Sequence, residues 1–249
     1  MNKMATDSFI KVMTLNVNGF RGIDNKIISD EIRLNHMKLI RQLIAKVLVN
    51  KNDIIILQEI PHKIMGSKRG HWFTNPLYNK FKEIFQEYKI LQPKYLINSI
   101  QCTVAICGKN SLWEQLREDL LQYDSSHSYG NKFVELQCGG INLLGVHMPP
   151  EEEMWNQLMQ TLKDAPYTFI VGDFNAYEKR GEMSDKPKSI IDCGYNYLIA
   201  NNIITCYSYQ SSIDNIYMNF NFTIDKYIEV KVVNTNLSDH ALCILEYGY

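Results

Sequence analysis

The sequence contains no paired-cysteine motif. Its six cysteines are scattered along 249 residues, and none of them forms a CxxC pair. Zinc and redox motifs of that kind are therefore not expected, and neither is a disulfide framework. Most of these cysteines lie in apolar stretches, where cysteine behaves as a small buried hydrophobic residue. We therefore expect no disulfide-linked partner.

Long apolar runs are also missing. No window approaches the roughly 18 apolar residues of a membrane-spanning helix, and the first residues carry no apolar signal core. With 45% hydrophobic and 21% charged residues, the composition is that of a globular protein, and it shows no repeats. We expect a single domain over residues 1–249, without a membrane segment and in a cytoplasmic setting.

The sequence also has no excess of positive charge. The formal net charge is −1, so no global basic field indicates a protein that coats nucleic acid. A local basic cluster does occur within residues 61–76, beside two aromatic residues; it consists of His62, Lys63, Lys68, Arg69 and His71, with Trp72 and Phe73. This segment is either a solvated loop or a contact for a phosphate backbone with aromatic stacking.

Apolar runs and turn residues predict a series of strands along the chain. The predicted strands cover residues 10–16, 53–59, 101–107, 132–138, 141–147, 167–172, 203–207, 214–219, 227–233 and 241–247. Helices are predicted over residues 31–49, 77–87, 111–121, 151–164 and 188–200, and residues 177–187 are predicted to be an exposed loop. The opening order of strand, helix and buried strand indicates a layered α/β fold.

The most informative stretch is the run Phe169–Ala176, in which an apolar strand ends in a glycine and a carboxylate and an amide follow. Alternation along an extended chain places Asp173 and Asn175 on the same side, at the carboxyl end of the strand. Oxygen ligands in this position suit a hard cation or the activation of a water. The alternative is a simple Asp-Asn turn, because both residue types favour turns.

Several predicted strands begin or end with polar side chains, and no serine or cysteine nucleophile is among these side chains. These side chains are Asn16 and Asn18, Glu59, His147, Asp173 and Asn175, Asp214, and Asp239 with His240. Carboxylates and amides are suitable ligands for Mg²⁺ or Mn²⁺. Histidines can bind a phosphate or pair with an aspartate. Together these residues predict metal-assisted hydrolysis of a phosphoester.

In this order, the motifs resemble those of the endonuclease/exonuclease/phosphatase superfamily, which includes DNase I, exonuclease III-like abasic-site endonucleases, retrotransposon endonucleases, neutral sphingomyelinases and inositol polyphosphate phosphatases. The similarity spans nearly the whole chain, and the string GDFNA at residues 172–176 is its most specific part. The other matching segments are 14–21, 57–59, 145–147, 213–216 and 238–240.

The resemblance implies an α/β fold, namely a four-layer α/β/β/α sandwich with two packed mixed β-sheets. It also implies a Mg²⁺ cofactor, for which Mn²⁺ can substitute. Glu59 would bind this ion, helped by Asn16 or Asn18 and by Asp239. Arg21 in the first motif, and Lys63, Lys68 and Arg69 in the basic cluster described above, are the candidates for contacting phosphate or nucleic acid.

The resemblance further implies catalytic roles. Asp173 would orient or deprotonate the attacking water, and Asn175 would hold that water or the phosphate. His240 would form a hydrogen bond to the scissile phosphate, and Asp214 would pair with a histidine and fix its orientation. His147 matches the central histidine motif.

Three functions fit these residues. The first is a metal-dependent nuclease whose partner is nucleic acid, with DNA favoured by the first motif and by the basic segment. The second is a phospholipid or inositol-phosphate hydrolase, which is favoured by the low basicity and by His147, since abasic-site enzymes typically carry tyrosine there. The third is a catalytically silent binding module, which the presence of Glu59, Asp173 and His240 disfavours.

Overall fold

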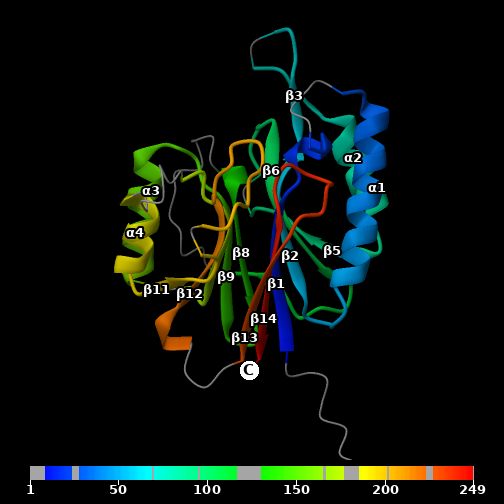
Figure 1. Cartoon of the computed structure of the whole chain (residues 1–249). Coiled ribbons are helices and arrows are strands. Elements are labelled where there is room, and N and C mark those ends of the chain that lie inside the picture. Colours follow the sequence, from blue (N-terminus) through cyan, green and yellow to red (C-terminus); the bar gives the residue numbers. More distant parts are fainter. Residues whose placement is uncertain are drawn as a thin grey trace, which may run out of the picture.

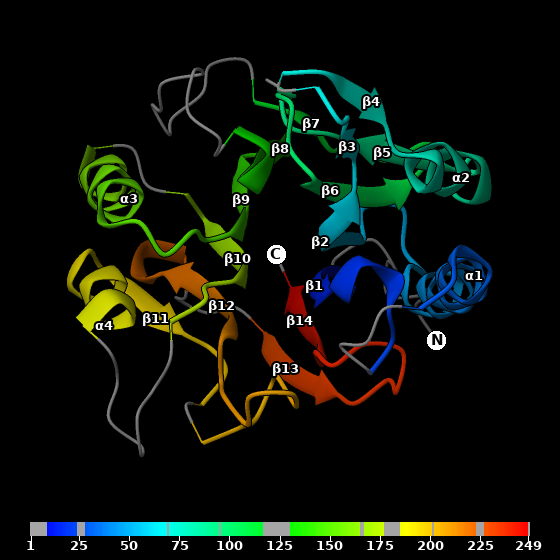
Figure 2. The ribbon, with the colours of Figure 1, turned by 90° about the horizontal axis from the view of Figure 1, so that it is seen from above.

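Two six-stranded β-sheets pack face to face, and helices cover the outer face of each sheet (Figure 1). The computed structural model of the chain describes residues 9–23, 28–68, 70–94, 96–116, 130–164, 167–176, 185–200, 202–222 and 227–248. The view along the strands separates the four layers (Figure 2). The predicted four-layer α/β/β/α sandwich is confirmed.

The first sheet has the strand order β13-β14-β1-β2-β6-β5. Its strands are β1 (Phe9–Asn16), β2 (Ile54–Pro61), β5 (Tyr88–Leu91), β6 (Gln101–Gly108), β13 (Ile228–Val233) and β14 (Leu242–Gly248). Only β1 and β2 are parallel neighbours, and the remaining pairs are antiparallel. Helices α1 (Asp30–Val47) and α2 (Pro76–Ile84) cover this sheet, because Met37, Ile40 and Ile44 of α1 recur at helical spacing and pack on its strands.

The second sheet has the strand order β11-β12-β10-β9-β8-β7. Its strands are β7 (Glu114–Gln115), β8 (Phe133–Cys138), β9 (Ile141–His147), β10 (Phe169–Asp173), β11 (Tyr195–Tyr197) and β12 (Asp214–Asn219). Strands β9 and β10 are the parallel pair of this sheet. Helices α3 (Glu152–Asp164) and α4 (Asp185–Asp192) cover its outer face, where Trp155 and Leu158 lie in one apolar cluster with Ile170 and Tyr217.

The core between the sheets is built from alternate residues of the central strands. Val12 of β1 and Ile56 of β2 lie in the same buried cluster as Val171 of β10 and Ile216 of β12. The sheets approach closely at Gly145, where a Cβ atom would lie 2.8 Å from Cγ2 of Ile56. Burial of both faces explains why the central strands read as continuous apolar runs in the sequence.

Short elements complete the described part of the chain. Strands β3 (Lys63–Met65) and β4 (Trp72–Thr74) form a separate hairpin that projects beyond the sheets (Figure 1). Three 3-10 turns span η1 (Asn18–Phe20), η2 (Gly130–Lys132) and η3 (Phe220–Phe222). None of the helices among the described residues is long and apolar enough to cross a membrane, and all six cysteines are free.

Most predicted elements are present, but five regions differ from the sequence-based expectations. Residues 61–76 are not all loop, since they include the β3–β4 hairpin. Strand β5 was not predicted. Residues 111–116 contain the short strand β7 rather than a helix, and residues 117–121 lie outside the described part of the chain. Edge strands of two to four residues are too short to show a reliable alternation of apolar and polar residues.

The other two differences lie in the second half of the chain. Helix α4 begins at Asp185, inside the predicted loop, and it ends at Asp192 rather than near residue 200, because β11 follows at Tyr195. The remainder of that loop, residues 177–184, lies outside the described residues. The strand predicted at 203–207 is reduced to isolated bridges at Cys206, since residues 203–205 make no ladder with a neighbour.

Candidate active site

The predicted polar residues come together at one edge of the sandwich, where the parallel strands of both sheets end. Asp173 is the register partner of His147 on β9 and of Asp214 on β12. Asn16 ends β1 in the other sheet, next to Gln58 of β2. Because parallel strands end at a common edge, side chains that are far apart in the sequence become neighbours.

Asn16 connects the two sheets through its side-chain amide. Its Nδ2 group donates hydrogen bonds to Oε1 of Glu59 at 3.1 Å and to Oδ2 of Asp173 at 3.0 Å. Its Oδ1 atom accepts a hydrogen bond from the backbone N–H of Asn18 at 2.9 Å, which fixes the orientation of the amide. One buried amide therefore holds two carboxylates at a defined separation. The predicted role of Asn16 as a metal ligand stays a prediction.

Glu59 reaches the site because β2 is irregular at this point. The register of β2 against β6 shifts between Leu57 and Ile60, and Glu59 has a φ of +59°. An irregularity of this kind redirects a side chain that regular pleating would point elsewhere. Gln101 on β6 donates a hydrogen bond to Oε2 of Glu59 at 2.8 Å. Asn18 and Asn175 also have positive φ values, of 49° and 48°, so strained backbone is concentrated at this site.

Asp173 is buried, and its two carboxylate oxygens accept hydrogen bonds from Asn16 and from the backbone of Asn175. The backbone N–H of Asn175 donates to Oδ1 at 2.8 Å, and the Asn175 side chain donates to the Met148 carbonyl at 2.9 Å. Burial, together with the nearby Asp214 carboxylate, raises the pKa of Asp173 to about 7, against the opposing effect of His240. A carboxylate with this pKa is suited to accept a proton near neutral pH.

The backbone leading into Asp173 requires glycine at residue 172. Gly172 has a φ of +149°, and a Cβ atom there would lie 2.0 Å from the carbonyl oxygen of Val146 on the parallel strand. No side chain fits in that space. The glycine thus allows β9 and β10 to bring His147 and Asp173 side by side.

His240 and Asp214 form a buried pair. Nδ1 of His240 lies 2.9 Å from Oδ2 of Asp214. Burial alone would lower the pKa of His240, but the Asp214 carboxylate, together with Cys206 and Asp173, outweighs burial and holds this pKa well above its ordinary value. Thr205 fixes Asp214 in turn, because its hydroxyl oxygen accepts the backbone N–H of Asp214 at 2.9 Å. The imidazole of His240 therefore has a fixed orientation and carries a positive charge that suits an anionic phosphate.

His147 is neutral, in contrast to His240. Burial and the neighbouring Lys132 ammonium lower its pKa well below the ordinary value. Lys132 places Nζ 3.0 Å from Nδ1 of His147. Nδ1 is therefore the acceptor and Nε2 carries the proton, 4.0 Å from Oε1 of Glu59 and 4.0 Å from Oδ2 of Asp173.

Asp239 lies near two serines, of which Ser208 holds its carboxylate. Ser208 donates a hydrogen bond to Oδ2 of Asp239 at 2.5 Å. Ser238 lies 3.4 Å from Oδ1 of Asp239 and donates a shorter bond, of 2.6 Å, to the backbone carbonyl of Asn16. Ser238 therefore links the last predicted motif, residues 238–240, to the end of β1 by a direct hydrogen bond.

A polar cavity of about 180 Å³ opens between these side chains. It is lined by Asn18, Arg21, Glu59, Asp173, Asn175, Tyr209, Ile213, Asp239 and His240. His147 and Asp214 stand behind this lining, where they support Asp173 and His240. A cavity of this size accommodates a small anion or ion with its waters.

The predicted phosphate contacts are divided between two places. Arg21 lies at the cavity, and its Nη2 atom is 3.8 Å from Oε2 of Glu59. Lys63 and Lys68 belong to the β3–β4 hairpin and do not line the cavity. Arg69 lies outside the described residues. The hairpin starts at Lys63, just after β2 ends at Pro61, and none of its described residues lines the cavity.

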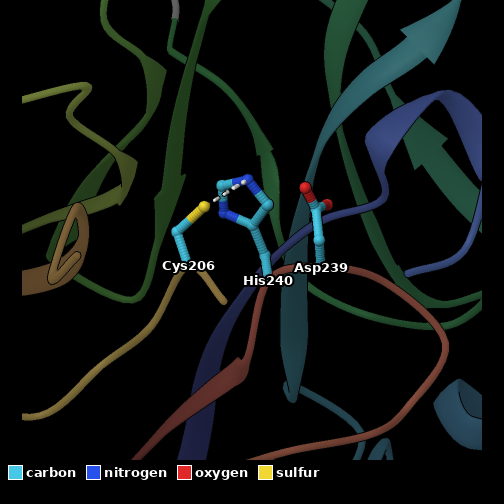
Figure 3. A group of neighbouring side chains, drawn as sticks. All are labelled: Cys206, Asp239 and His240. Atoms are coloured by element: carbon cyan, nitrogen blue, oxygen red, sulfur yellow. Dashed lines mark hydrogen bonds between the residues drawn. The ribbon is translucent and has the colours of Figure 1, made fainter. Parts of the chain in front are cut away.

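Four side chains of this region lie outside the motifs recognised in the sequence. Gln101 and Lys132 contact Glu59 and His147, Tyr209 lines the cavity, and the Cys206 thiol lies 3.6 Å from Nε2 of His240 (Figure 3). None of the four falls in a recognisable motif. The one available signal was that Lys132 is the first residue of the strand predicted at 132–138, which the Gly139-Gly140 turn joins to the strand that ends at His147.

The side chains present fit a divalent cation. Three carboxylates, those of Glu59, Asp173 and Asp239, line one cavity together with the amide of Asn18. The raised pKa of Asp173 records the cost of holding this negative charge away from water. An all-oxygen donor set with several acids suits Mg²⁺ or Mn²⁺.

Solved structures share this fold over nearly their full length. The endonuclease domain of TRAS1, a telomere-specific non-LTR retrotransposon, has a TM-score of 0.61 at 15% identity, covering 96% of this chain and 97% of that chain. The 3′-5′ exonuclease NExo from Neisseria meningitidis has a TM-score of 0.60 at 16% identity, with 96% and 100% covered. An AP endonuclease from Archaeoglobus fulgidus has a TM-score of 0.55 at 15% identity, with 95% and 98% covered.

The chain therefore has the fold of the endonuclease/exonuclease/phosphatase superfamily. At these sequence identities the similarity establishes the fold. No protein-family model and no curated protein sequence matches this sequence.

Proposed function

We propose that this protein is a Mg²⁺-dependent phosphodiesterase that acts as a nuclease, with DNA as its substrate. One observation carries the proposal: Glu59, Asp173, Asp239 and His240, from three separate segments, line a single polar cavity. Three acids and an imidazolium around one small space match the needs of phosphoester hydrolysis. The residue types alone would not distinguish this site from three unrelated turns.

The proposed cation is held by Glu59 and Asp239, with Asn16 or Asn18 assisting, as predicted from the sequence. When bound, Mg²⁺ neutralises the charge that develops on the phosphoryl oxygens. Asp173 accepts the proton of the attacking water, because its pKa of about 7 keeps an appreciable fraction of the carboxylate ionised near neutral pH. Asn175, which the backbone turn after Asp173 fixes, holds this water or the phosphate.

Both histidines act as hydrogen-bond donors, but His240 is positively charged and His147 is neutral. His240 binds the scissile phosphate as an imidazolium, and the Asp214 carboxylate keeps it protonated and oriented. His147 is neutral and presents Nε2–H toward Glu59 and Asp173. Arg21 at the cavity adds a guanidinium for an adjacent phosphate, since its planar group suits phosphate oxygens.

Two observations favour nucleic acid. The β3–β4 hairpin carries Lys63 and Lys68, and Phe73 on the same hairpin is 60% exposed, which offers a surface for a base. Among proteins with this fold, the 3′ phosphatase NExo from Neisseria was solved as a variant bound to a product DNA hairpin. We therefore place DNA first among the substrates.

A phospholipid or inositol phosphate is the second candidate substrate. It is favoured by the same hairpin, because Met65 and Phe73 are each 60% exposed and Ile64 is 46% exposed, which leaves apolar surface next to the site. The catalytic residues would be unchanged. The two candidates differ in what the hairpin contacts, a nucleic-acid strand or a lipid surface.

Hydrolysis by the purified protein tests this proposal. The substrates are plasmid DNA, an abasic-site duplex, single-stranded RNA and a phosphoinositide in vesicles, each with Mg²⁺, with Mn²⁺ and with chelator. We expect metal-dependent cleavage of DNA that Asp173→Ala reduces by about 10²- to 10⁴-fold. The matched control is Asp192→Ala, because this aspartate is exposed at the end of α4, away from the site.

The outcomes separate the candidates. Hydrolysis of the phosphoinositide in preference to DNA would move the assignment to the second candidate. Folded wild-type protein that cleaves none of the substrates with either metal would refute phosphodiester hydrolysis. Binding of Mg²⁺, followed as a rise in melting temperature that Glu59→Ala removes, reports on the metal site without any substrate.

A further inference from the structure

A second group of possible metal ligands, which includes a thiol, lies at the edge of the cavity and shares Asp239 and His240 with it. It consists of Cys206, Asp239 and His240, whose ligand atoms all lie within 4.8 Å of one another and whose residues are all buried. We propose that these three side chains form a binding site for Zn²⁺, and that its occupation inhibits the enzyme. No CxxC motif signals such a site, because its ligands come from two segments that meet only in the folded chain.

The distance between the thiol and the imidazole fits zinc. Sγ of Cys206 lies 3.6 Å from Nε2 of His240 (Figure 3). With Zn–S near 2.3 Å and Zn–N near 2.0–2.1 Å at a tetrahedral angle, the two ligand atoms stand about 3.5–3.6 Å apart. The observed spacing therefore needs no adjustment. Without an ion, a thiol opposite an imidazole makes only a weak hydrogen bond.

His240 is oriented for metal binding by its other nitrogen. Nδ1 lies 2.9 Å from Oδ2 of Asp214, so Nε2 is the atom that faces Cys206. A carboxylate behind the distal nitrogen is the usual second partner of a zinc-bound histidine, where it fixes the tautomer and increases the basicity of the ligand nitrogen. Zinc binding would displace the protons of the imidazolium and the thiol.

The backbone holds the two ligand segments side by side. Cys206 forms β-bridges with Ser211 and with His240. The backbone N–H of Tyr207 donates to the Asp239 carbonyl at 2.7 Å, and that of Ala241 donates to the Thr205 carbonyl at 2.7 Å. These bonds fix the Cα positions of the ligands before any ion arrives. The cost of organising the site is therefore small.

Asp239 supplies the third ligand and the link to the cavity. Figure 3 shows its carboxylate beside the His240 ring, on the side away from Cys206. Ser208 holds this carboxylate by one hydrogen bond, which a turn toward the thiol would replace. Asp239 and His240 both line the cavity, so an ion reaches them from there and a water completes the tetrahedron.

The consequence for activity rests on the proposed function. Mg²⁺ prefers oxygen ligands, whereas thiolate and imidazole select Zn²⁺. Zinc at this site would occupy Nε2 of His240, the atom proposed to bind the scissile phosphate, and would withdraw Asp239 from the magnesium site. The protein would then be active with Mg²⁺ and inhibited by Zn²⁺ through Cys206.

The first experiment measures binding without any substrate. Metal-free protein is titrated with Co²⁺ as a spectroscopic substitute for Zn²⁺. We expect the intense visible bands of tetrahedral cobalt and a thiolate-to-cobalt charge-transfer band in the near ultraviolet, both displaced by one equivalent of Zn²⁺. Wild-type protein that shows no charge-transfer band would overturn the proposal.

Variants then assign the ligands. Cys206→Ala should abolish the charge-transfer band and weaken zinc affinity by about 100-fold or more, because removing a direct ligand costs more than the 10- to 100-fold lost with an outer partner. Asp214→Asn should weaken it about 10- to 100-fold. Cys102→Ala is the control, since Cys102 is equally buried but lies on β6 in a separate cluster. A charge-transfer band that persists in Cys206→Ala, or that disappears in Cys102→Ala, would overturn the assignment.

Two further arms complete the test. Cys206→Ser replaces Cys206→Ala in all measurements if the alanine variant does not fold, because serine keeps the volume but not the soft ligand. In the hydrolysis assay, zinc inhibition should weaken in Cys206→Ala by the same factor as zinc binding. If binding follows the expected pattern and no substrate is ever hydrolysed, the proposed function fails while the zinc site stands.

Discussion

The ammonium of Lys132 lies 3.0 Å from Nδ1 of His147, although both groups are basic and both are largely buried. The contact is stable only if one of the two is uncharged. The pKa of His147 is lowered by burial and by Lys132 itself, so the imidazole is the neutral partner. The lysine thereby decides which nitrogen of His147 carries the proton.

Replacing Lys132 with methionine should therefore raise the pKa of His147. Methionine keeps the apolar stem and removes the charge, so part of the effect that keeps His147 neutral is lost while burial remains. A pH titration of the histidine ring signals by NMR measures the change. The surface variant Lys80→Met is the control, and an unchanged His147 titration in Lys132→Met would show that burial alone keeps the ring neutral.

The Asp214–His240 pair should make folding stability depend on pH in a defined direction. The pKa of His240 in the folded state is raised above its unfolded value near 6.5. The pair therefore contributes its full stability below about pH 6.5, and this stability is lost as the pH rises through the raised folded pKa. Asp214→Asn should accordingly destabilise the protein more at about pH 6 than at about pH 9.

Chemical denaturation of metal-free wild type and Asp214→Asn at the two pH values measures this difference. Cys206→Ala removes a different neighbour of His240 and should leave most of the pH dependence in place. A penalty that is equal at both pH values would mean that the pair does not stabilise the protonated imidazole.

Tyr209 should bind a nucleobase if the substrate is single-stranded nucleic acid. It lines the cavity, and 62% of the residue is exposed to solvent. Stacking of a base on an aromatic ring is worth about 1–3 kcal/mol, so Tyr209→Ala should raise KM for a single-stranded oligonucleotide by about 5- to 150-fold. Tyr209→Phe should retain most of the affinity.

A phosphodiester without a base serves as the comparison substrate. Tyr209→Ala should hardly change its KM, since it has nothing to stack. Equal effects on both substrates would instead indicate that the tyrosine hydroxyl or ring acts at the phosphate, and Tyr209→Phe would then distinguish the hydroxyl from the ring.

Gly172→Ala should be among the most damaging single substitutions in the second sheet. A Cβ atom at this position meets the Val146 carbonyl oxygen at 2.0 Å, and the φ of +149° is unfavourable for any other residue. We expect a loss of at least about 3 kcal/mol in the free energy of unfolding. The control is Gly139→Ala in the β8–β9 turn, which has positive φ but open space and should lose about 1 kcal/mol.

Equilibrium denaturation of both variants provides the comparison. Similar losses for the two substitutions would indicate that β9 and β10 can separate slightly at Gly172. In that case the spacing between His147 and Asp173 would be less rigid than the structure implies.

The sequence predicted the parts of this protein that follow from local patterns. Buried strands such as 167–172 appear as continuous apolar runs, and α1 shows helical periodicity with Met37, Ile40 and Ile44 on one face. The candidate site residues were recognised because each lies at one end of an apolar run, in a motif of fixed order. Motifs of this kind are local, so no knowledge of the fold is needed to detect them.

Elements that depend on a partner were not predicted correctly. The short strands β5 and β7 exist because neighbouring strands offer hydrogen bonds to their backbone, and four residues or fewer carry too little pattern. The segment at 203–207 looked like a strand, yet its backbone bonds go to the Ser211 turn and to Asp239 instead. Tertiary context overrode propensity at each of these places.

The sequence by itself determined the fold class and the types of side chain at the candidate site. Both follow from local features, namely the pattern of apolar residues and the order of the motifs. Only the tertiary structure decided which charge each histidine of the site carries and which side chains surround it. Lys132 is 15 residues from His147, and Cys206 is 34 residues from His240. The protonation of one histidine and the soft-metal ligand beside the other depend on distances of a few ångströms. These distances arise only when β8 has paired with β9 and when the segments that carry Cys206 and His240 have met in the folded chain.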